Sequence, residues 1–422
     1  MEIAPEHKFD VSVLGLGYIG LPTAAFFASS GLLVSGFDVD EDRVETIQRG
    51  MVPFKEPGFN SLLTKVTASQ SLIASTTLQP AHSYIISVPT PLKENKDPDD
   101  SYVLDAATRI ASLLKGGELI VLESTSPPGL TTKIQDHILQ LRPDLTCEPE
   151  RPESIYCAYA PERVLPGRVM REMKSNDRVV GGTTHTATEK AAALYSRFCA
   201  GTVHKTDSKT AEMVKLTENA FRDVNIAFAN ELSIICDSVG VDVWELIDLA
   251  NKHPRVDILQ PGPGVGGHCI AVDPWFIAGA APNQSRLIPT ARTVNDLKPK
   301  FVLNQIDKYL AGQERSHCKT IGILGITFKA DIDDLRESPA LKIAQQLAES
   351  YPSHRLLVVE PNLEFLPSTL SCYENIKMAN LDSVLDTADV LVLLVDHAVF
   401  RERAETIAAH PHFVDTRGIG RF

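Results

Sequence analysis

The sequence predicts an α/β protein in which two Rossmann-like, doubly wound domains are joined by a helical middle domain with one long spine helix. Two stretches in which short apolar runs alternate with helical patterns predict the doubly wound domains, because strand–helix alternation produces a mostly parallel, covered sheet. Between them, a hydrophobic residue recurs at every seventh position from Val214 to Ile235 without proline or glycine, which predicts the long helix.

The size and composition of the chain are those of a multidomain globular protein. It has 422 residues, of which 43% are hydrophobic and 23% charged. We expect a first doubly wound domain over residues 1–199, a helical domain over 200–312 and a second doubly wound domain over 313–422. No apolar run approaches the roughly 20 residues of a membrane-spanning helix, and the first residues lack the pattern of a secretory signal. We therefore expect a cytoplasmic protein with no membrane partner.

Charge and cysteine content exclude several classes of site. A formal net charge of −13 leaves no basic stripe for a phosphodiester backbone, so nucleic acid is not an expected partner. The 7 cysteines are an odd number without CxxC or Cys/His ligand spacing, so we expect neither a disulfide framework nor a metal site.

The predicted elements follow one another in a regular order. Residues 8–43 are predicted to form a strand, a glycine-rich turn, a helix and a second strand, and apolar runs at 83–88, 118–123 and 155–160 predict further strands. One helix is predicted from Ser208 to Gly240, and its apolar face is a candidate dimer surface or, alternatively, part of an intramolecular core. A second alternation then runs through TIGILG, a helix over 338–350, RLLVVEP, DVLVLLV and HFVDTRG.

The first glycine-rich turn has the pattern of a dinucleotide site. Gly15, Gly17 and Gly20 form GxGxxG directly after a predicted strand, and Asp38 ends the next strand. The first two glycines permit a tight turn and close approach to a pyrophosphate, and the third allows the helix to pack on the strand. Asp38 would accept hydrogen bonds from the adenosine ribose hydroxyls of NAD. Arg43 could stack on adenine or contact the ribose, and its charge would reduce the preference for NAD over NADP. The alternative is a structural glycine turn.

Threonines follow two later strands of the first domain. SVPTP at residues 87–91 contains Thr90, and ESTSPPG at 123–129 contains Thr125. Because ligands bind at the carboxyl ends of strands in open parallel sheets, both residues are candidates for the nicotinamide side of the cofactor. Isolated polar residues in turns are nevertheless more often structural.

A glycine- and proline-rich loop surrounds one cysteine. In QPGPGVGGHCIAVDPWF, over residues 260–276, Cys269 follows a run of glycines and precedes Asp273. Glycines around a thiol leave room for a substrate carbon, and nearby positive charge would lower the pKa of the thiol so that the nucleophilic thiolate is available. A lone cysteine is usually a small buried hydrophobic residue, but the flanking loop favours a nucleophile.

Further charged and amide side chains are candidates for the same chemistry. Lys215 and Asn219 lie one turn apart on the long helix and could act on one group, although a solvated helix face is the alternative. Glu162 in APERVLPG follows a predicted strand and could activate water. In GITFKADIDDLRES, Lys329 and Arg336 could bind phosphate, or could pair with the neighbouring aspartates.

The chain resembles the UDP-glucose/GDP-mannose dehydrogenase family over nearly its whole length. The resemblance is carried, in this order, by GLGYIG, SVPTP, STSPPG, PERVLPG, KLTENAF, GPGVGGHCIAVDP and FKADIDDLRES. Within the family, GGHC followed by IAVDPWF is most similar to members that act on UDP-N-acetyl-D-mannosamine, whereas members that act on UDP-glucose typically carry GGSC. The sequence departs from the common STVPPGT at Ser126 and Leu130, which removes no charged group.

The resemblance implies a four-electron oxidation of a UDP-sugar with two NAD and water. UDP-N-acetyl-D-mannosamine would become UDP-N-acetyl-D-mannosaminuronate, with Cys269 holding the intermediates as a thiohemiacetal and then a thioester. The other implied catalytic residues are Lys215 and Asp273 for protons and water, Asn219 for the oxyanion-like intermediate, Glu162 for thioester hydrolysis and Thr125 for the water network.

The resemblance also implies binding residues and a partner. The implied cofactor-binding residues are Gly15, Gly17, Tyr18, Ile19, Gly20, Asp38, Arg43, Pro89, Thr90, Thr125 and Arg336. The implied substrate-binding residues are Glu162, Arg163, Val164, Lys215, Asn219, Arg255, Gly266, His268, Phe328, Lys329 and Arg417. The last domain would bind the UDP-sugar, and the chain would form a homodimer through its middle domain, with Arg255 reaching the partner's substrate.

Three alternative functions remain compatible with parts of the sequence. The same chemistry could act on UDP-N-acetylglucosamine, UDP-N-acetylgalactosamine or UDP-glucose, because pocket shape decides which C2 substituent is accepted. A single two-electron oxidation of a hydroxy acid would need neither Cys269 nor the second α/β domain. A nucleotide-sensing protein without turnover would leave Lys215, Asn219 and Cys269 without a role.

Overall fold

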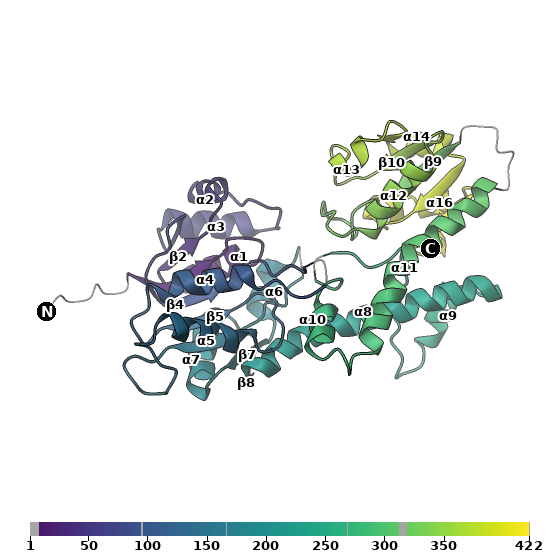
Figure 1. Ribbon diagram of the computed structural model, residues 1–422. Helices are drawn as coiled ribbons and strands as arrows, with labels where there is room; N and C mark the ends of the chain where they lie inside the picture. The colour runs from purple at the N-terminus through teal and green to yellow at the C-terminus, as the bar shows by residue number, and fades with distance from the viewer. Residues whose placement is uncertain (1–7, 94–95, 166, 268, 312–318, 422) are drawn as a thin grey trace. The chain divides into compact units, whose positions relative to one another are not determined.

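The computed structural model describes residues 8–93, 96–165, 167–267, 269–311 and 319–421. The chain divides into two compact units, Met1–Glu218 and Asn219–Phe422, and each contains a Rossmann-like sheet (Figure 1). The predicted fold class, two doubly wound sheets with a helical region between them in the chain, is confirmed. The three-domain division of the chain stays a prediction.

The first unit is built on an eight-stranded sheet in the order β3-β2-β1-β4-β5-β6-β7-β8. Its strands are β1 (Phe9–Leu14), β2 (Val34–Phe37), β3 (Leu72–Ser75), β4 (Ala81–Ile86), β5 (Leu119–Leu122), β6 (Tyr156–Tyr159), β7 (Arg178–Gly182) and β8 (Val203–Asp207). Neighbouring strands pair in parallel except β6 and β7, which are antiparallel. The strand order reverses between β1 and β4, and open α/β sheets bind ligands at such a reversal.

Helices cover both faces of this sheet. They are α1 (Gly20–Ser29), α2 (Glu41–Gln48), α3 (Phe59–Ala68), α4 (Ser101–Ala111), α5 (Leu130–Leu141), α6 (Val169–Ser175), α7 (His185–Tyr195) and the first part of α8 (Ser208–Val239). One core cluster joins α1, α3, α6 and α7 to the strands, and another joins α4 and α5 to them. The central strands are continuous apolar runs in the sequence because both of their faces are buried.

Three strands of this sheet, β3, β7 and β8, were not among those predicted from the sequence, and β8 also extends the sheet at its far edge. The last strand, β8, pairs in parallel with β7, so the sheet continues beyond residue 199 to Asp207. Its sequence, VHKTD, contains no apolar run, and its side chains are exposed or half-buried. An edge strand of this kind gives no hydrophobic signal, because only one of its sides is paired.

The second unit contains a five-stranded parallel sheet in the order β11-β10-β9-β12-β13. Its strands are β9 (Thr320–Leu324), β10 (Arg355–Val359), β11 (Ile376–Met378), β12 (Val390–Leu393) and β13 (Phe413–Asp415). The helices that follow α8 are α9 (Val243–Ala250), α10 (Asp273–Ala280), α11 (Leu287–Ala311), α12 (Pro339–Ser350), α13 (Ser368–Ser371), α14 (Leu381–Thr387), α15 (Ala398–Arg401) and α16 (Ala404–Ala408), with a 3₁₀ turn at Ile419–Arg421.

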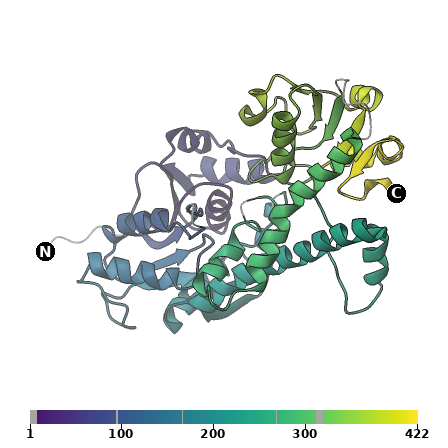
Figure 2. The same ribbon diagram turned by 45° about the vertical axis from the view of Figure 1, so that its right-hand side comes forward.

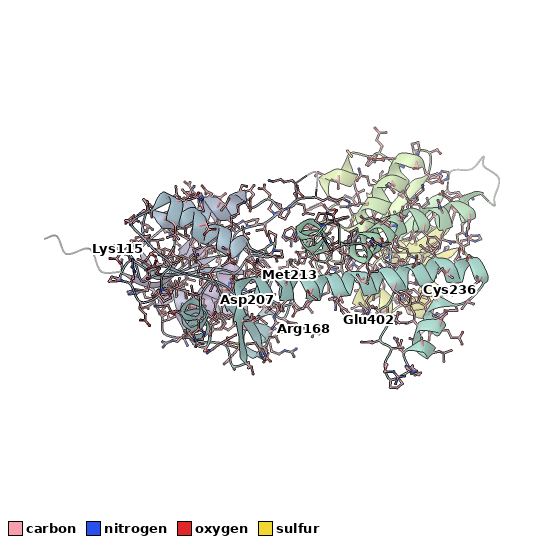
Figure 3. All side chains as sticks on the ribbon, turned by 60° about the horizontal axis from the view of Figure 1, so that its bottom comes forward. Lys115, Arg168, Asp207, Met213, Cys236 and Glu402 are labelled. Carbon is pink, nitrogen blue, oxygen red and sulfur yellow. The ribbon has the colours of Figure 1, made fainter. Side chains whose placement is uncertain are left out.

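The long helix α8 has the bounds that the sequence predicts. Asp207 caps its start by accepting a hydrogen bond from the Thr210 amide at 2.9 Å, and Gly240 follows its end with a φ of 72°. Figure 3 shows the helix running without a break from Asp207 past Met213 to Cys236. In the second unit α8 lies beside α11, as Figures 1 and 2 both show.

The described part of the chain has no feature of a membrane-spanning, metal-binding or disulfide-linked protein. There, no helix is long and apolar enough to span a bilayer. The same residues contain no cluster of His, Cys, Asp or Glu side chains suited to a metal ion, and the 6 cysteines among them form no disulfide.

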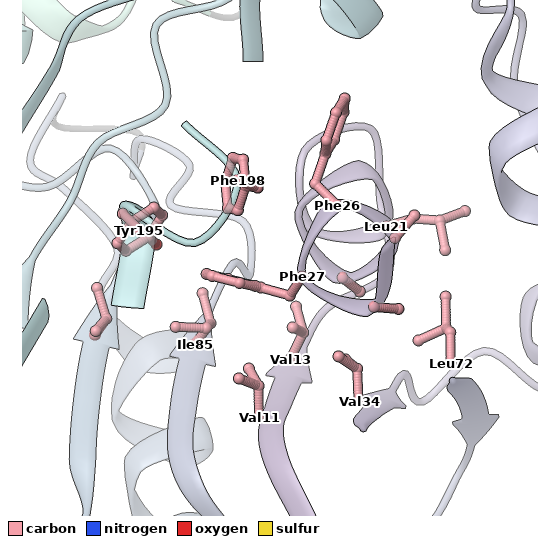
Figure 4. Packing of buried hydrophobic residues seen from close by; sticks show 14 of the residues in the cluster. Val11, Val13, Leu21, Phe26, Phe27, Val34, Leu72, Ile85, Tyr195 and Phe198 are labelled. Carbon is pink, nitrogen blue, oxygen red and sulfur yellow. The ribbon is translucent and has the colours of Figure 1, made fainter. Parts of the chain in front are cut away.

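The core of the first unit depends on one aromatic cluster. Figure 4 shows Phe27 of α1 above the strand residue Val13 and near Tyr195. The Phe27 side chain is fully buried, and its ring centroid lies 5.4 Å from that of Tyr195 and 4.9 Å from that of Phe198.

Replacing Phe27 by alanine should therefore lower the free energy of unfolding by about 3–5 kcal/mol, because a large buried ring leaves a cavity. Guanidinium denaturation followed by circular dichroism measures this loss. Phe365→Ala is the control, since Phe365 is 74% exposed and its loss should change the value by less than about 0.5 kcal/mol. Equal effects of the two substitutions would contradict the packing described.

Candidate active site

The turn between β1 and α1 is tightly packed except at one glycine. Gly15 has a φ of 91°, and a Cβ there would lie 2.4 Å from the Ser87 carbonyl oxygen. A Cβ on Gly20 would lie 1.9 Å from the Gly15 carbonyl oxygen, whereas a Cβ on Gly17 would meet no described atom within 4 Å. Ile19 precedes α1 without a side-chain cap on the helix amides. This open, uncapped helix start fits the pyrophosphate of a dinucleotide.

Asp38 directly follows β2, within one residue of the predicted position, and its carboxylate has three partners. It accepts hydrogen bonds from the Leu16 amide at 2.8 Å and from the Asp40 amide at 3.0 Å. Arg43, which sequence analysis placed near adenine or the ribose, pairs with Asp38 at 3.0 Å. The pairing supplies positive charge beside Asp38 and so weakens the repulsion that the carboxylate would exert on a 2′-phosphate.

Tyr18 connects the glycine turn to the PERVLPG segment. Its hydroxyl donates to Glu56, and the same carboxylate accepts the Gly167 and Val169 amides, each at 2.9 Å. The Gly167 amide also lies 3.1 Å from the Tyr18 hydroxyl. Glu56 was not a candidate on sequence, because a glutamate in a loop of ordinary composition gives no signal of its distant partners.

The two predicted threonines at strand ends are brought together. The Thr90 hydroxyl donates to the Thr125 carbonyl oxygen at 2.7 Å, and the Ser124 hydroxyl donates to the Val88 carbonyl oxygen at 2.6 Å. The turns after β4 and β5, including Pro89, are thereby joined at the carboxyl ends of adjacent strands. This is the edge of the sheet at which a cofactor ring would be expected.

A residue that the sequence analysis missed, Glu212 of α8, holds the second of these turns. Its fully buried carboxylate accepts the amides of Gly129 at 2.5 Å and Thr131 at 2.8 Å, and the Thr131 hydroxyl at 2.6 Å. Burial raises the pKa of Glu212. The only sequence signal was its position between Ala211 and Leu216, both on the buried face of the helix.

Glu162 lies in a loop after β6, but its side chain is largely buried. Its side chain is 7% exposed and accepts hydrogen bonds from Arg178 at 2.5 Å and from the Arg163 amide at 2.7 Å. Arg163 itself pairs with Glu218 of α8 at 2.6 Å. Val164 follows and packs partly buried against the core of the first unit. Ion pairs and apolar packing therefore hold residues 162–164 in place.

Lys215 and Asn219 lie one turn apart on α8, as the sequence predicts. Lys215 is half-buried and belongs to the first unit, whereas Asn219 begins the second. In the second unit Asn219 donates to the carboxylate of Asp273 at 2.5 Å. The Asp273 amide in turn donates to the Cys269 carbonyl oxygen at 2.8 Å. A side-chain hydrogen bond thus joins two predicted catalytic residues, Asn219 and the nearly fully buried Asp273, and the half-buried Cys269 precedes Asp273 by four residues.

The glycines before Cys269 are also required by packing. A Cβ on Gly266 would lie 2.7 Å from the Glu337 carbonyl oxygen, and one on Gly267 would lie 3.0 Å from the Phe328 ring. The Gly267 amide donates to the Arg336 carbonyl oxygen at 3.0 Å. The glycine-rich loop therefore lies directly against the segment after β9.

The predicted cations of the second unit surround this loop. Arg336 pairs with Asp334 at 2.6 Å, and this hydrogen bond, with a smaller attraction to Cys269, raises the pKa of the guanidinium. Arg417 pairs with Asp396 at 2.8 Å and lies 2.6 Å from a Cβ built on Gly262. Placement of Arg336 beside NAD stays a prediction.

The remaining predicted substrate-binding residues are Lys329, Arg255 and His268. The Lys329 carbonyl oxygen accepts the Thr327 hydroxyl at 2.9 Å. Arg255 is exposed and lines a mostly apolar cavity of about 480 Å³ together with Phe221 and Phe228. His268 lies outside the described residues.

A buried polar network between α8 and α11 holds the start of the glycine-rich loop, and sequence analysis missed it. Asn230 accepts the Gly262 amide at 2.9 Å and donates to Asn295 at 2.8 Å. Asn295 donates to the Asp223 carboxylate at 2.8 Å, and Arg292 pairs with that carboxylate at 2.6 Å. Each member is at most 3% exposed.

Comparison with known proteins gives similarity over the whole chain. The sequence matches the family models of the UDP-glucose/GDP-mannose dehydrogenase family: the NAD binding domain over residues 9–199, the central domain over 209–297 and the UDP binding domain over 322–421. The UDP-N-acetyl-D-mannosamine dehydrogenase of Escherichia coli (strain K12) is 51% identical over 420 residues, which cover 97% of this chain and 99% of the relative.

Another curated relative has a different sugar in its name. The NDP-N-acetyl-D-galactosaminuronic acid dehydrogenase of Ralstonia nicotianae is 50% identical over 411 residues, which cover 97% of this chain and 96% of that one. The solved structure of a UDP-D-ManNAc dehydrogenase from Pyrococcus horikoshii is 36% identical, with a TM-score of 0.86 and coverage of 97% of this chain and 96% of the other.

Gly17 provides a direct test of the cofactor surface. Gly17→Ala should leave the fold intact, because the added methyl meets no described atom within 4 Å, but should weaken NAD binding by about tenfold, or ~1.4 kcal/mol. Isothermal titration with NAD measures the effect. Gly279→Ala on α10 is the control, since that position is equally open. An unchanged dissociation constant for Gly17→Ala would exclude this surface as the pyrophosphate site.

Proposed function

We propose, because this chain belongs to the UDP-glucose/GDP-mannose dehydrogenase family, that it oxidises UDP-N-acetyl-D-mannosamine to UDP-N-acetyl-D-mannosaminuronate with two NAD and water. The observation that carries the proposal is the hydrogen bond between Asn219 and Asp273, together with the bond from the Asp273 amide to the carbonyl oxygen of Cys269. A thiol suits the oxidation of an alcohol to a carboxylate, because it can hold the intermediate aldehyde covalently for the second oxidation.

The proposed chemistry has two oxidations followed by hydrolysis. Bound NAD supplies a hydride acceptor, and two are consumed because conversion of the C6 alcohol to a carboxylate removes four electrons. Loss of the first hydride and a proton converts the C6 alcohol to the aldehyde. The Cys269 thiolate then adds to the aldehyde carbon, and protonation of the C6 oxygen gives a thiohemiacetal. Loss of the second hydride and a proton leaves the thioester, and attack by water breaks the carbon–sulfur bond and releases the carboxylate, the thiolate and two protons.

Lys215, Asn219 and Asp273 would manage charge and protons in the reaction at Cys269. We assign to Lys215 the acceptance and return of the proton on the C6 oxygen, since an ammonium group stabilises an oxyanion most where water is excluded. Asn219 would donate to the same oxygen. Asp273, oriented by Asn219, would position the water that attacks the thioester.

Glu162 would assist the hydrolytic step. Its Oε atoms are fixed by Arg178 and by the Arg163 amide, so the carboxylate is oriented and remains an acceptor for a proton from water. Thr125, whose carbonyl oxygen accepts Thr90, would belong to the same network of water and cofactor contacts.

N-acetylmannosamine is supported as the sugar by the names of similar proteins and by the sequence around Cys269. The UDP-N-acetyl-D-mannosamine dehydrogenase of Escherichia coli is 51% identical to this chain. The relative from Ralstonia nicotianae is named for N-acetylgalactosaminuronic acid and is 50% identical, which makes the galacto sugar the main alternative.

A panel assay tests the proposal. The protein is incubated with NAD and UDP-N-acetylmannosamine, UDP-N-acetylgalactosamine, UDP-N-acetylglucosamine or UDP-glucose, and NADH is counted per sugar consumed. We expect two NADH and a uronate from the manno sugar. One NADH with a released aldehyde would contradict the four-electron mechanism, and preferred turnover of another sugar would correct the substrate.

The role of Cys269 is tested separately by Cys269→Ser. This variant should keep the affinity for the UDP-sugar but lose net conversion to the uronate by about 10³-fold or more, because the thioester cannot form. Cys372→Ser, at an exposed cysteine, is the matched control and should retain normal turnover. Four-electron turnover by Cys269→Ser near the unsubstituted rate would exclude covalent catalysis.

We also propose that a second copy of the chain covers the apolar face of α8. Phe221, Phe228 and Ile235 recur every seven residues on this helix and are 67%, 49% and 49% exposed. Exposed apolar side chains at this spacing form the seam along which helices pack in pairs. The cavity lined by Arg255 adjoins the same face.

We further propose that the chain forms three domains, with boundaries at residues 199 and 312. We also propose that the protein is located in the cytoplasm, where Cys269 would stay reduced.

Phe228→Asp tests this interface. A charge in the centre of an apolar interface should convert a dimer to a monomer, which light scattering after gel filtration measures. Phe365→Asp is the control, since Phe365 is exposed on a loop of the second unit. A monomeric unsubstituted protein, or a dimeric Phe228→Asp, would exclude this surface as the interface.

A further inference from the structure

We propose that Arg178 and Glu123 are positioning residues for Glu162, and that the ionisation of Glu123 sets how strongly Glu162 attracts a proton. The proposal rests on the role given to Glu162 in thioester hydrolysis. Sequence analysis named neither residue as a candidate, because they become neighbours of Glu162 only through the pairing of β5, β6 and β7.

The Arg178 side chain forms an ion pair with Glu162. It begins β7, is 4% exposed, and its Nη2 donates to Glu162 Oε2 at 2.5 Å. The guanidinium carbon lies 4.9 Å from the ring centroid of Tyr195 and 5.1 Å from that of Phe198. Among the described residues its Nε and Nη1 atoms have no hydrogen-bond partner. The faces of the two aromatic rings therefore stabilise this side of the cation. A guanidinium fixed in this way orients the carboxylate that it binds.

Glu123 is joined to the same cluster through Tyr195. It follows β5, is 3% exposed, and accepts the Thr23 hydroxyl at 3.0 Å and the Tyr195 hydroxyl at 3.1 Å. Tyr195 therefore contacts Glu123 with its hydroxyl and Arg178 with its ring. The groups that face Glu123 are Thr23 from α1, Tyr195 from α7, Arg178 from β7 and Glu162 from the segment after β6.

One guanidinium cannot neutralise two buried carboxylates. Burial and then the charge of Glu162 raise the pKa of Glu123 to about 7, against the opposing effects of Arg178 and the two hydroxyl groups. In a medium of low dielectric constant the neutral cluster is favoured, so it retains one proton near neutral pH. The hydroxyl donors are bound to Glu123, whereas the cation is bound to Glu162, so we place this proton on Glu123.

This arrangement makes the strength of Glu162 as a base depend on Glu123. While Glu123 is neutral, the positive charge of Arg178 interacts with Glu162 alone. Once Glu123 ionises, the same cation is shared between two carboxylates, and Glu162 takes a proton from water more readily. A stronger base increases the rate of a proton-transfer step, so thioester hydrolysis should accelerate as the pH rises through about 7.

Thermal unfolding tests the coupling without turnover. Folded Glu123 keeps its proton up to about pH 7, whereas the unfolded chain loses it near the ordinary glutamate value. The proton thus stabilises the fold at low pH, and this stabilisation is lost as the pH rises through 7. We expect the melting temperature of the unsubstituted protein relative to Glu123→Gln to fall between about pH 5 and 8. In a Glu162→Gln background, the midpoint of that fall should move to lower pH.

Steady-state turnover over the same pH range tests the catalytic consequence. Glu123→Gln should lose the inflection near pH 7 and turn over several-fold more slowly at pH 8, with little change in KM, whereas Glu123→Asp should retain the inflection. Glu118→Gln is the matched control, since Glu118 is 1% exposed and lies at the other end of β5, where it accepts the Lys115 and Gly116 amides. This control should keep the unsubstituted profile.

The outcomes separate this proposal from the proposed function. A melting difference that does not change with pH, or an identical midpoint in the Glu162→Gln background, overturns the coupling whatever the turnover data show. An inflection retained in Glu123→Gln, or lost equally in Glu118→Gln, overturns the catalytic consequence. Absence of NADH with every UDP-sugar overturns the proposed function instead, and leaves the coupling to be decided by the unfolding data.

Discussion

A charge removed from water must find its partner inside the protein, and the candidate site depends on this constraint. Glu212 is satisfied by the amides that begin α5, Glu162 by Arg178, and Asp223 by Arg292. Removing one member of a buried ion pair costs roughly 3–5 kcal/mol, because the other charge is left uncompensated. The segments held by these groups carry residues with proposed catalytic or cofactor roles, so the same contacts stabilise the fold and orient the chemistry.

Close approach of backbone is the second constraint, and it acts in both units. Gly20 packs against the Gly15 carbonyl oxygen, whereas Gly17 leaves the open surface at which a pyrophosphate fits. In the second unit, Gly267 lies against the ring of Phe328, so the loop before Cys269 is fixed by the segment after β9. A single two-electron dehydrogenase would not need a thiol held in this way.

The sequence predicts the parts of this fold whose signal is local. The two alternations of apolar runs predict both sheets, and the seven-residue period predicts α8 to within a residue of its end. The strand β8 was missed because an exposed edge has no apolar run. Cys269 could be identified by its glycine-rich neighbours. Glu56, Glu123 and Arg178 could not be identified, because their partners are distant in the chain and share no sequence motif with them.

Covalent catalysis by Cys269, with Glu162 required to release the product, is the central proposal. Intact-protein mass spectrometry of Glu162→Gln, mixed with NAD and UDP-N-acetylmannosamine and quenched in acid, tests it most directly. We expect a uronyl thioester to accumulate on the protein, and peptide mapping to locate it on Cys269. Absence of any adduct, while the variant still forms NADH from the sugar, would contradict covalent catalysis.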